Sequence, residues 1–472
     1  MEQRKNSLWA MCLIATAVCS IYSFVLNSQV IAVLSVSAPV ARDVVYGLKL
    51  IPLFAIAFFL PRLLSSNVSK RLTIASGMLA LLGCALMFAA SAVPANATQF
   101  TIGAFAALCL GGTWFSALPL LLLCRLKSFE SVASCSIASY VLSSVGSVLL
   151  ASTSSEINIA LLAILPCVVL LLSHTTTQEY AKFSEGSDHI RELELRNLRS
   201  FASFDNPAFI CIFVFHCVSG FALALNCISG VPIHSVAPTI FVIAFALVAF
   251  VRAKQYSAVD SLAGIAAFFV VGGLLIALAL IDQAPVLASN IALSTGSDLL
   301  LVLEMLIIAS MGSRSPLGAL RVIALSKMFS SAGTLVGSAS GHFINEATAA
   351  NQLVATSSIA LILFVFLVLC YIWLRRYSFE KLIFAIEPPL PVEPPSAPPE
   401  ELQLKCEAAG KKYGLTKREI EICRMLASGM GGKEIEQTCV ISYNTVKTHV
   451  KHIYTKLDVH SQQELIDLIS AL

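Results

Sequence analysis

The sequence predicts an all-α protein in two parts: a polytopic membrane helix bundle of about 12 spans, arranged 6+6, and a small C-terminal domain of four short helices. Of its 472 residues, 57% are hydrophobic and 12% are charged, against roughly 25% charged in soluble globular proteins. Long stretches such as 6–41 and 72–124 contain no Asp, Glu, Lys or Arg. Residues 402–472, in contrast, hold 18 of the 59 charged residues. A charge-poor membrane part is therefore joined to a charge-rich soluble part.

The first span follows Arg4 and Lys5, a basic start that also fits a secretory signal peptide. The uncharged run continues to Ala41, far beyond the 7 to 15 apolar residues typical of such a peptide, so a first membrane helix is favoured. Pro, Gly and polar clusters divide the apolar runs into spans near residues 9–35, 44–63, 72–92, 100–123, 132–151, 157–174, 207–228, 236–252, 260–281, 287–310, 318–339 and 353–374.

The loops between these spans differ in basic charge on the two sides of the membrane. One set of loops holds fourteen Lys and Arg residues: Arg4, Lys5, Arg62, Lys70, Arg71, Arg125, Lys127, Lys182, Arg191, Arg196, Arg199, Arg252, Lys254 and Arg314. The other set holds only Arg42. Because basic loops stay in the cytoplasm, we expect a multi-pass protein of the cell membrane with its N- and C-termini both cytoplasmic.

The longest internal polar stretch, residues 175–206, separates six spans from six. This layout resembles the topology of the major facilitator transporters, whose two related halves surround a site near the membrane midplane. That family usually has a Gly-x-x-x-Asp-Arg-x-Gly-Arg pattern between spans two and three. This chain has PRLLSSNVSKRL there, which keeps basic charge but has no Asp and no Gly.

Five charged residues fall within predicted spans: Lys49, Asp298, Glu304, Arg321 and Lys327. Such residues usually face a partner or a cavity because an ionisable group in the membrane is costly. Asp298 and Glu304 lie six residues apart, as do Arg321 and Lys327, which allows two ion pairs between neighbouring helices. A polar ligand site or proton-linked site, lined by Glu304, Lys327 and Lys49, is the alternative.

Other residues in the spans are interpreted as packing residues. His216 lies in a span rich in Phe and Cys. Gly333, Gly337 and Gly341 recur at four-residue spacing, which is typical of close helix packing. The 14 cysteines include no CxxC pair and no His cluster accompanies them, so no metal site is expected.

A proline-rich segment, EPPLPVEPPSAPPE at 387–400, has seven prolines in fourteen residues. We expect neither helix nor sheet there but a semi-rigid spacer in polyproline II geometry. A proline-rich ligand for a partner domain is the alternative. The predicted domains are thus a transmembrane sensor-like domain at 1–377, a linker at 378–401 and a soluble domain at 402–472.

The soluble domain has clear local helix signals. Thr416 and Glu419 form a capping box, and Gly429 ends the helix that follows. A short segment from Lys433 to Thr438 precedes a helix capped by Ser442. That helix has an apolar stripe of Val446, Val450, Ile453 and Leu457, and a last helix starts after Ser461. Short helices with a tight turn before a polar-faced one are the plan of a helix-turn-helix domain.

The segment LTKREIEICRMLASGMGGKEIEQTCVISYNTVKTHVKHIYTKLDVHSQQELIDLI resembles the LuxR-type DNA-binding domain over about 55 residues. The shared motifs are LTxRE, KEI, IS-x-x-TVKxH, IYxKL and the terminal EL-I. There are departures from the family pattern at Gly431-Gly432, Glu436, Asp458 and Gln462. Glu436 and the Arg missing at 462 reduce positive charge, which predicts weaker phosphate contact.

The resemblance implies that Lys447, Thr448 and Lys451 face base edges or adjacent phosphates. It also implies that Thr445, His449, Lys433 and the amides near Ser442 contact the DNA backbone. The last helix resembles the family's dimer helix, with Leu465, Ile466, Leu468 and Ile469. A local charge of +2, from ten basic and eight acidic residues, predicts modest affinity for a monomer, so dimerisation is expected.

We therefore expect a membrane-embedded one-component transcriptional regulator whose spans sense a signal and whose C-terminal domain binds DNA. A membrane transporter with an attached regulatory DNA-binding domain is the alternative. We expect no enzyme, because no nucleophile and base constellation is visible, and no cofactor. Expected partners are double-stranded DNA, the lipid bilayer, a second copy of the chain, an unknown small-molecule signal and RNA polymerase.

Overall fold

The computed structural model describes residues 2–126, 128–183, 206–225, 237–252, 257–279, 286–314, 318–350, 352–384 and 399–472. The first half of the bundle contains α1 (Glu2–Ser37), α2 (Pro39–Gly47), α3 (Leu50–Phe58), α4 (Leu60–Leu63), α5 (Ser66–Ala92), the short η1 (Pro94–Asn96), α6 (Ala97–Leu123), α7 (Phe129–Ala151) and α8 (Ser155–Phe183). Most of the central polar stretch and of the linker lie outside the described residues. So do five of the basic residues assigned to loops: Lys127, Arg191, Arg196, Arg199 and Lys254.

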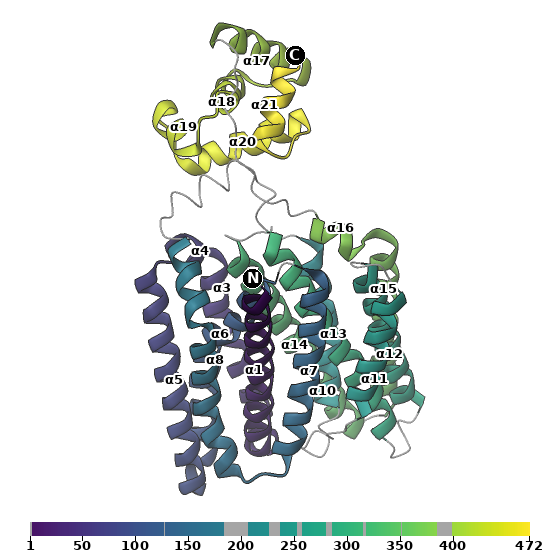
Figure 1. The fold of residues 1–472 in the computed structure, drawn as a ribbon. Coiled ribbons are helices and arrows are strands. Elements are labelled where there is room, and N and C mark those ends of the chain that lie inside the picture. The colour runs from purple at the N-terminus through teal and green to yellow at the C-terminus, as the bar shows by residue number, and fades with distance from the viewer. Residues whose placement is uncertain are drawn as a thin grey trace.

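The second half contains α10 (Pro207–Leu225), α11 (Ala237–Arg252), α12 (Ser257–Ala279), α13 (Val286–Arg314), α14 (Ala319–Ala350), α15 (Gln352–Arg376) and the short α16 (Phe379–Phe384). In the part of the chain that the structure describes, nine helices are long and apolar enough to cross a membrane, and α10 and α11 contain shorter apolar stretches. The N-terminus of α1 and helix α16 lie at the same end of the bundle (Figure 1). This arrangement agrees with an even number of crossings.

The predicted second span, 44–63, is interrupted. The chain leaves α2 at Gly47, passes through a turn at Leu48 and Lys49, and resumes in α3. Pro52 lacks the N–H that an α-helix would direct to the carbonyl of Leu48, which favours a break there. The assignment of Arg42 to a loop was wrong, because α2 already begins at Pro39 and includes Arg42.

The two halves meet along α14 with α2 and α3, and along α7 with α11 and α13. Within the second half, α10 and α14 pack closely through glycines. A Cβ atom at Gly333 would lie 2.3 Å from the carbonyl oxygen of Phe213, and one at Gly337 would lie 1.8 Å from that of Cys217. The packing interpretation of these two glycines is therefore confirmed.

Large apolar side chains cover the outside of the bundle, as expected for a surface that faces lipid. Leu171 is 77% exposed and Phe268 is 73% exposed.

The short helix α16 packs against α10, α12 and α13 of the second half. Asp260 of α12 holds its start: Ser378 Oγ donates to Asp260 Oδ2 at 2.7 Å, and the Phe379 amide donates to Oδ1 at 2.8 Å. The chain thus leaves the bundle from a helix anchored to the second half.

The soluble domain consists of α17 (Pro399–Tyr413), α18 (Lys417–Ala427), α19 (Gly432–Cys439), α20 (Tyr443–Leu457) and α21 (Gln462–Ser470). Its buried residues, from Leu402 to Ile469, form an apolar core of their own. Helix α17 was not predicted, and its start overlaps the last two residues of the proline-rich segment. Pro399 can begin a helix because the first helical residue needs no N–H partner.

The helix starts of the soluble domain follow the predicted signals. The Thr416 and Glu419 capping box is present at α18. Ser442 Oγ accepts from the Thr445 amide at α20, and Ser461 Oγ accepts from the Glu464 amide at α21. Gly429, at φ 85°, follows the end of α18 in the left-handed region that favours glycine. These local predictions are confirmed.

Candidate functional site

Helix α20 presents one polar face outside the core of the soluble domain. Val446, Val450 and Ile453 are fully buried, so the residues between them point away. These outward residues form a shallow surface groove lined by Asn444, Lys447, Thr448, Lys451, His452, Thr455 and Lys456. We call this set the α20 face. Its amide, hydroxyl and ammonium groups are the donors that read base edges and neutralise phosphates.

The predicted DNA-contacting residues fall into two groups. Lys447, Thr448 and Lys451 lie on the α20 face. Thr445 and Ser442 are exposed at the start of α20, where their hydroxyls lie 2.8 Å apart and Ser442 caps the helix. Their first-turn position suits a phosphate, because helix N-termini favour anions. Lys433 is exposed on α19, and His449 is half-buried on α20.

Four residues of the α20 face were absent from the predicted DNA-contacting set: Asn444, His452, Thr455 and Lys456. Helical spacing could have found them. Positions 444, 448, 451 and 455 follow one another at steps of four, three and four, and therefore share a face. Lys456 also has a structural role, because its Nζ lies 2.7 Å from Glu419 Oε2 and 3.0 Å from the Gly414 carbonyl oxygen.

Glu419 links the start of α18 to the end of α20. Its carboxylate accepts from the Thr416 amide at 2.8 Å and from Lys456. Burial raises the pKa of a carboxyl group, but here the hydrogen bonds from Lys456 and Thr416 outweigh burial and hold the pKa of Glu419 below its ordinary value. The acid therefore stays ionised at neutral pH and fixes the position of α20.

Three departures from the LuxR pattern have structural roles. Glu436 Oε1 accepts from the Tyr443 amide at 3.0 Å, which supports the start of α20. Gln462 is fully buried, and its amide nitrogen donates to the carbonyl oxygens of Leu426 and Met430. Asp458 ends α20 at φ 54°, a left-handed conformation that Asp tolerates better than most residues. The side chains at 436 and 462 are thus engaged within the domain.

The residues predicted for a dimer helix lie in α21. Leu465, Ile466 and Ile469 are buried within the domain, whereas Leu468 is half-buried. Helix α17 packs against α21, and Lys405 Nζ donates to the Ser470 carbonyl oxygen at 2.8 Å. Of the four, Leu468 keeps the largest exposed fraction.

A second candidate site is a cavity of about 600 Å³ in the helix bundle. Both halves contribute to it, from α1, α2, α6 and α7 on one side and α10, α11, α13 and α14 on the other. Its lining is rich in hydroxyl groups, including Ser20, Ser23, Ser143, Ser144, Ser147, Ser294, Ser297, Ser330 and Thr334. Arg42, Asp43, Asp298, Glu304 and Lys327 supply its charged side chains. The cavity can therefore hold a small polar molecule.

One of the two ion pairs expected from the sequence is present. Lys327 Nζ lies 3.7 Å from Glu304 Oε1, and His216 Nε2 lies 2.9 Å from Glu304 Oε2. Consecutive spans run in opposite directions, so Asp298 and Arg321 lie on opposite sides of this level, about 18 Å apart along the axis by helix rise. Asp298 instead accepts a hydrogen bond from the Tyr140 hydroxyl at 2.8 Å.

The other two predicted charges do not line the cavity. Lys49 Nζ lies 3.9 Å from the centre of the Tyr46 ring, and the Arg321 guanidinium lies 5.8 Å from that of Phe58. Both are cation–π contacts. His216, interpreted from the sequence as a packing residue, lines the cavity and contacts its buried acid.

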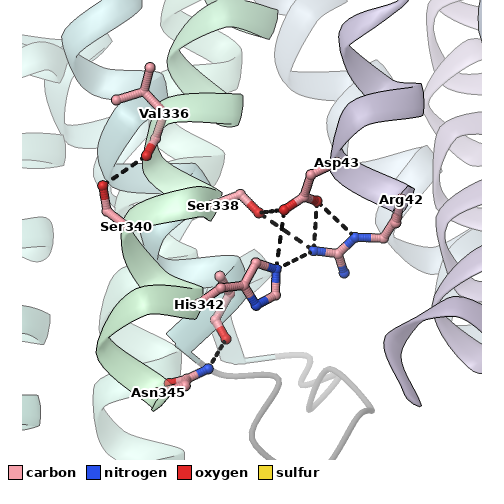
Figure 2. Close-up of polar contacts among 8 residues, drawn as sticks. Arg42, Asp43, Val336, Ser338, Ser340, His342 and Asn345 are labelled. Atoms are coloured by element: carbon pink, nitrogen blue, oxygen red, sulfur yellow. Dashed lines mark hydrogen bonds and ion pairs between the residues drawn. The ribbon is translucent and has the colours of Figure 1, made fainter. Parts of the chain in front are cut away.

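Four residues join the two halves beside the cavity: Arg42 and Asp43 from α2, and Ser338 and His342 from α14 (Figure 2). We call them the Arg42 cluster. Asp43 contacts Arg42 at 2.9 Å and His342 at 3.2 Å, and it accepts from Ser338 Oγ at 2.8 Å. Arg42 Nη2 lies 3.0 Å from His342 Nε2. Sequence reasoning missed this cluster because its members are about 300 residues apart.

The soluble domain matches the family described as "Bacterial regulatory proteins, luxR family" over residues 414–469. Residues 414–469 form a LuxR-family DNA-binding domain. It is 45% identical over 53 residues to the oxygen regulatory protein NreC of Staphylococcus haemolyticus, and to that of Staphylococcus aureus. The match covers 11% of this chain and 24% of NreC, so the chain spans about a quarter of the length of these curated relatives.

The bundle resembles the major facilitator transporters in fold. The human organic anion transporter MFSD10 aligns with 81% of this chain and 99% of its own chain, at 11% identity and a TM-score of 0.50. FucP, a major facilitator transporter in the outward conformation, aligns with 76% of this chain and 96% of its own, at 14% identity and a TM-score of 0.43. A multi-pass membrane bundle and a LuxR-family domain are thus parts of one chain. Among the described residues, no group of three or more His, Cys, Asp or Glu side chains could hold a metal ion.

Proposed function

We propose that the protein is a membrane-embedded one-component transcriptional regulator, in which the bundle senses a small-molecule signal and the LuxR-family domain binds DNA in response. The observation that carries this proposal is the α20 face. The core of the domain uses the apolar side of α20, and the basic and hydroxyl side remains open to a duplex. The polar cavity in the same chain supplies a place for the signal.

The proposed orientation puts both termini in the cytoplasm, at the cell membrane. Fourteen basic residues were assigned from the sequence to one side of the membrane and only Arg42 to the other, and Arg42 lies in α2 rather than in a loop. The DNA that the α20 face would bind is also in the cytoplasm. The predicted division at 1–377, 378–401 and 402–472 then corresponds to sensor, linker and output, with α16 holding the start of the linker against the second half.

The LuxR-family domain is proposed to act as a homodimer through α21, with RNA polymerase as a further partner. Two copies of α20 would meet two half-sites related by a two-fold axis, which offsets the modest charge of one domain. Leu468 is the residue of α21 best placed for this contact. Leu468→Glu should therefore weaken operator binding by the full-length protein and shift its LuxR-family domains from dimer to monomer in crosslinking experiments.

The DNA-binding part is tested by mapping genome occupancy and adjacent transcripts for wild type and Lys447→Ala. Loss of a base or phosphate contact costs about 1–3 kcal/mol, so occupancy and promoter response should fall about fivefold or more while membrane insertion stays normal. Lys411→Ala is the matched control, since it removes the same charge from an exposed position on α17. Equal occupancy in Lys447→Ala and wild type would refute the role of the α20 face.

The sensing part is tested with Glu304→Gln and Lys327→Met. Both should alter the transcriptional response to a signal, because each removes a charge from the cavity. The soluble domain has its own core and contains neither residue, so its DNA binding when expressed alone is the reference for an output without the sensor. An unaltered response would mean that the pair only stabilises the bundle.

A transporter with an attached regulatory domain is the second candidate function. The alignment of the bundle with MFSD10 favours it, since the likeness spans nearly the whole length of that chain. The missing loop pattern between spans two and three argues against it. Accumulation of solute by proteoliposomes containing the full-length protein would support transport, whereas ligand binding without flux would favour sensing.

A further inference from the structure

The Asp, Glu, Lys and Arg side chains that line the cavity do not balance in charge. Three are acids (Asp43, Asp298 and Glu304) and two are bases (Arg42 and Lys327). Each base has an acid of its own, with Arg42 at 2.9 Å from Asp43 and Lys327 at 3.7 Å from Glu304. Asp298 is the remaining acid. Within the described part of the chain, Asp298 accepts a hydrogen bond from Tyr140, and no Lys or Arg forms an ion pair with it.

The cavity also contains carboxylate oxygens that could accept more hydrogen bonds. An ionised carboxylate has about four lone-pair positions. Tyr140 donates to Oδ2 of Asp298, which leaves Oδ1 for another donor. Glu304 is 3% exposed, and its Oε1 atom is buried without a hydrogen bond because Lys327 Nζ is 3.7 Å away. Asp298 therefore has an oxygen without a hydrogen bond in the cavity lining, and Glu304 has a buried one beside Lys327.

A carboxylate in a membrane bundle needs a counter-charge. Water solvates it less well there than at a surface, so a bound cation with N–H donors would relieve both the charge and the unused acceptors. Asp298 and Glu304 lie six residues apart on α13, about 9 Å along the helix by its rise. A molecule that spans this distance could place an ammonium group at Asp298 and a second donor near Glu304.

The remaining lining limits the kind of cation. Ser and Thr hydroxyls surround the acids, and the rings of Phe24, Phe105 and Tyr140 also line the cavity. Hydroxyl groups bind polar substituents, and aromatic faces attract organic cations. A volume of about 600 Å³ suits a small molecule rather than a peptide.

We infer that the cavity binds a small organic ammonium ion, a primary amine with a polar or aromatic substituent, whose ammonium group pairs with Asp298. This inference deepens the proposed function, since it names the chemical class of the signal. Binding itself can be measured without any transcriptional readout, so the ligand class and the regulatory function can be refuted separately.

The test uses the purified full-length protein and measures the rise of its unfolding temperature with ligand concentration. The probes are ethanolamine, benzylamine and, as a reference with neither a polar nor an aromatic group, butylamine. Each is compared with the carboxylate that has the same skeleton: 3-hydroxypropanoate, phenylacetate and pentanoate. At least one amine should stabilise the wild type in a saturable manner, and the carboxylates should not. The inference would be overturned if none of the three amines bound saturably, or if only the carboxylates stabilised the protein.

Variants then locate the site. Asp298→Asn should weaken amine binding about tenfold or more, because a charge-assisted hydrogen bond becomes a neutral one. Glu156→Gln removes the same charge from an exposed position on α8 and should bind as the wild type does. Equal binding by Asp298→Asn and wild type would refute the assignment. If Asp298→Asn does not fold, Asp298→Glu, which keeps the charge, and Tyr140→Phe, which keeps the carboxylate, should both still prefer amines over carboxylates, and loss of that preference in both would count against the site.

The outcomes separate the two proposals. Amine binding without any change in transcription would leave the ligand class standing and refute the proposed regulatory function. A transcriptional response to a neutral or anionic compound, with no amine binding, would refute the ligand class and leave regulation standing.

Discussion

Substitution of Gly337 by Ala tests the packing of the second half. The added Cβ would lie 1.8 Å from the carbonyl oxygen of Cys217 and 2.7 Å from the amide nitrogen of Phe221. Both atoms belong to the backbone of α10 and cannot rotate away as a side chain can. The helices must separate until the shorter distance reaches at least 3.0 Å, but Gly220 and Gly333 hold the same interface. Such overpacking costs about 1–3 kcal/mol or more, whereas the better helix propensity of Ala returns only about 1 kcal/mol.

The assay is thermal unfolding of the purified full-length protein, with Gly272→Ala in α12 as the matched control. No atom lies within 4 Å of a Cβ built at Gly272, so that variant gains the propensity of Ala without a clash. We expect Gly337→Ala to unfold at least about 2 °C below the wild type, and Gly272→Ala to unfold at or above it. Equal unfolding temperatures for the two variants would refute the close-packing argument.

Three further predictions concern the LuxR-family domain and its attachment. Val440 ends α19 at φ 52° and is 88% exposed. Val440→Asn should stabilise the isolated domain by about 1 kcal/mol, measured by urea unfolding, since Asn tolerates this conformation. Equal stabilisation by Thr438→Asn, within the helix, would contradict this reason. The pKa of Glu419 is lowered on folding, so its contribution to the free energy of unfolding is complete above about pH 4.3 and is lost as the pH falls through the lower folded-state pKa. Glu419→Gln should remove that part of the acid sensitivity. An unchanged acid transition would count against this role of Glu419. Asp260→Ala should release the start of α16 and abolish the promoter response while the protein still inserts into the membrane, and a normal response would show that α16 does not transmit the signal.

The LuxR-family domain was largely predictable because its signals are local. The Thr416 and Glu419 capping box, the Ser442 and Ser461 caps and the apolar stripe of α20 depend on residues three or four apart. Helix α17 was not predicted. It packs against α18 and α21, so its place depends on contacts with segments that follow it in the sequence.

The cavity was only partly predictable. Glu304 and Lys327 stand out in apolar spans, and the structure places them together. The pairing of Asp298 with a base failed because of the register of the two helices. Antiparallel helices with equal spacing make two contacts only if Asp298 meets Lys327 and Glu304 meets Arg321, whereas here Glu304 meets Lys327. His216 and Arg42 looked ordinary, and their partners Glu304 and His342 lie far away in the sequence.

The sequence alone determined the class of the protein, the approximate position of most of its spans and the family of its C-terminal domain, because run length, charge bias and helix caps are properties of short segments. The tertiary structure decided which charges meet, which helices touch through glycine and where the cavity lies. Those features depend on the direction and rotation of whole helices, which the packing of distant segments sets.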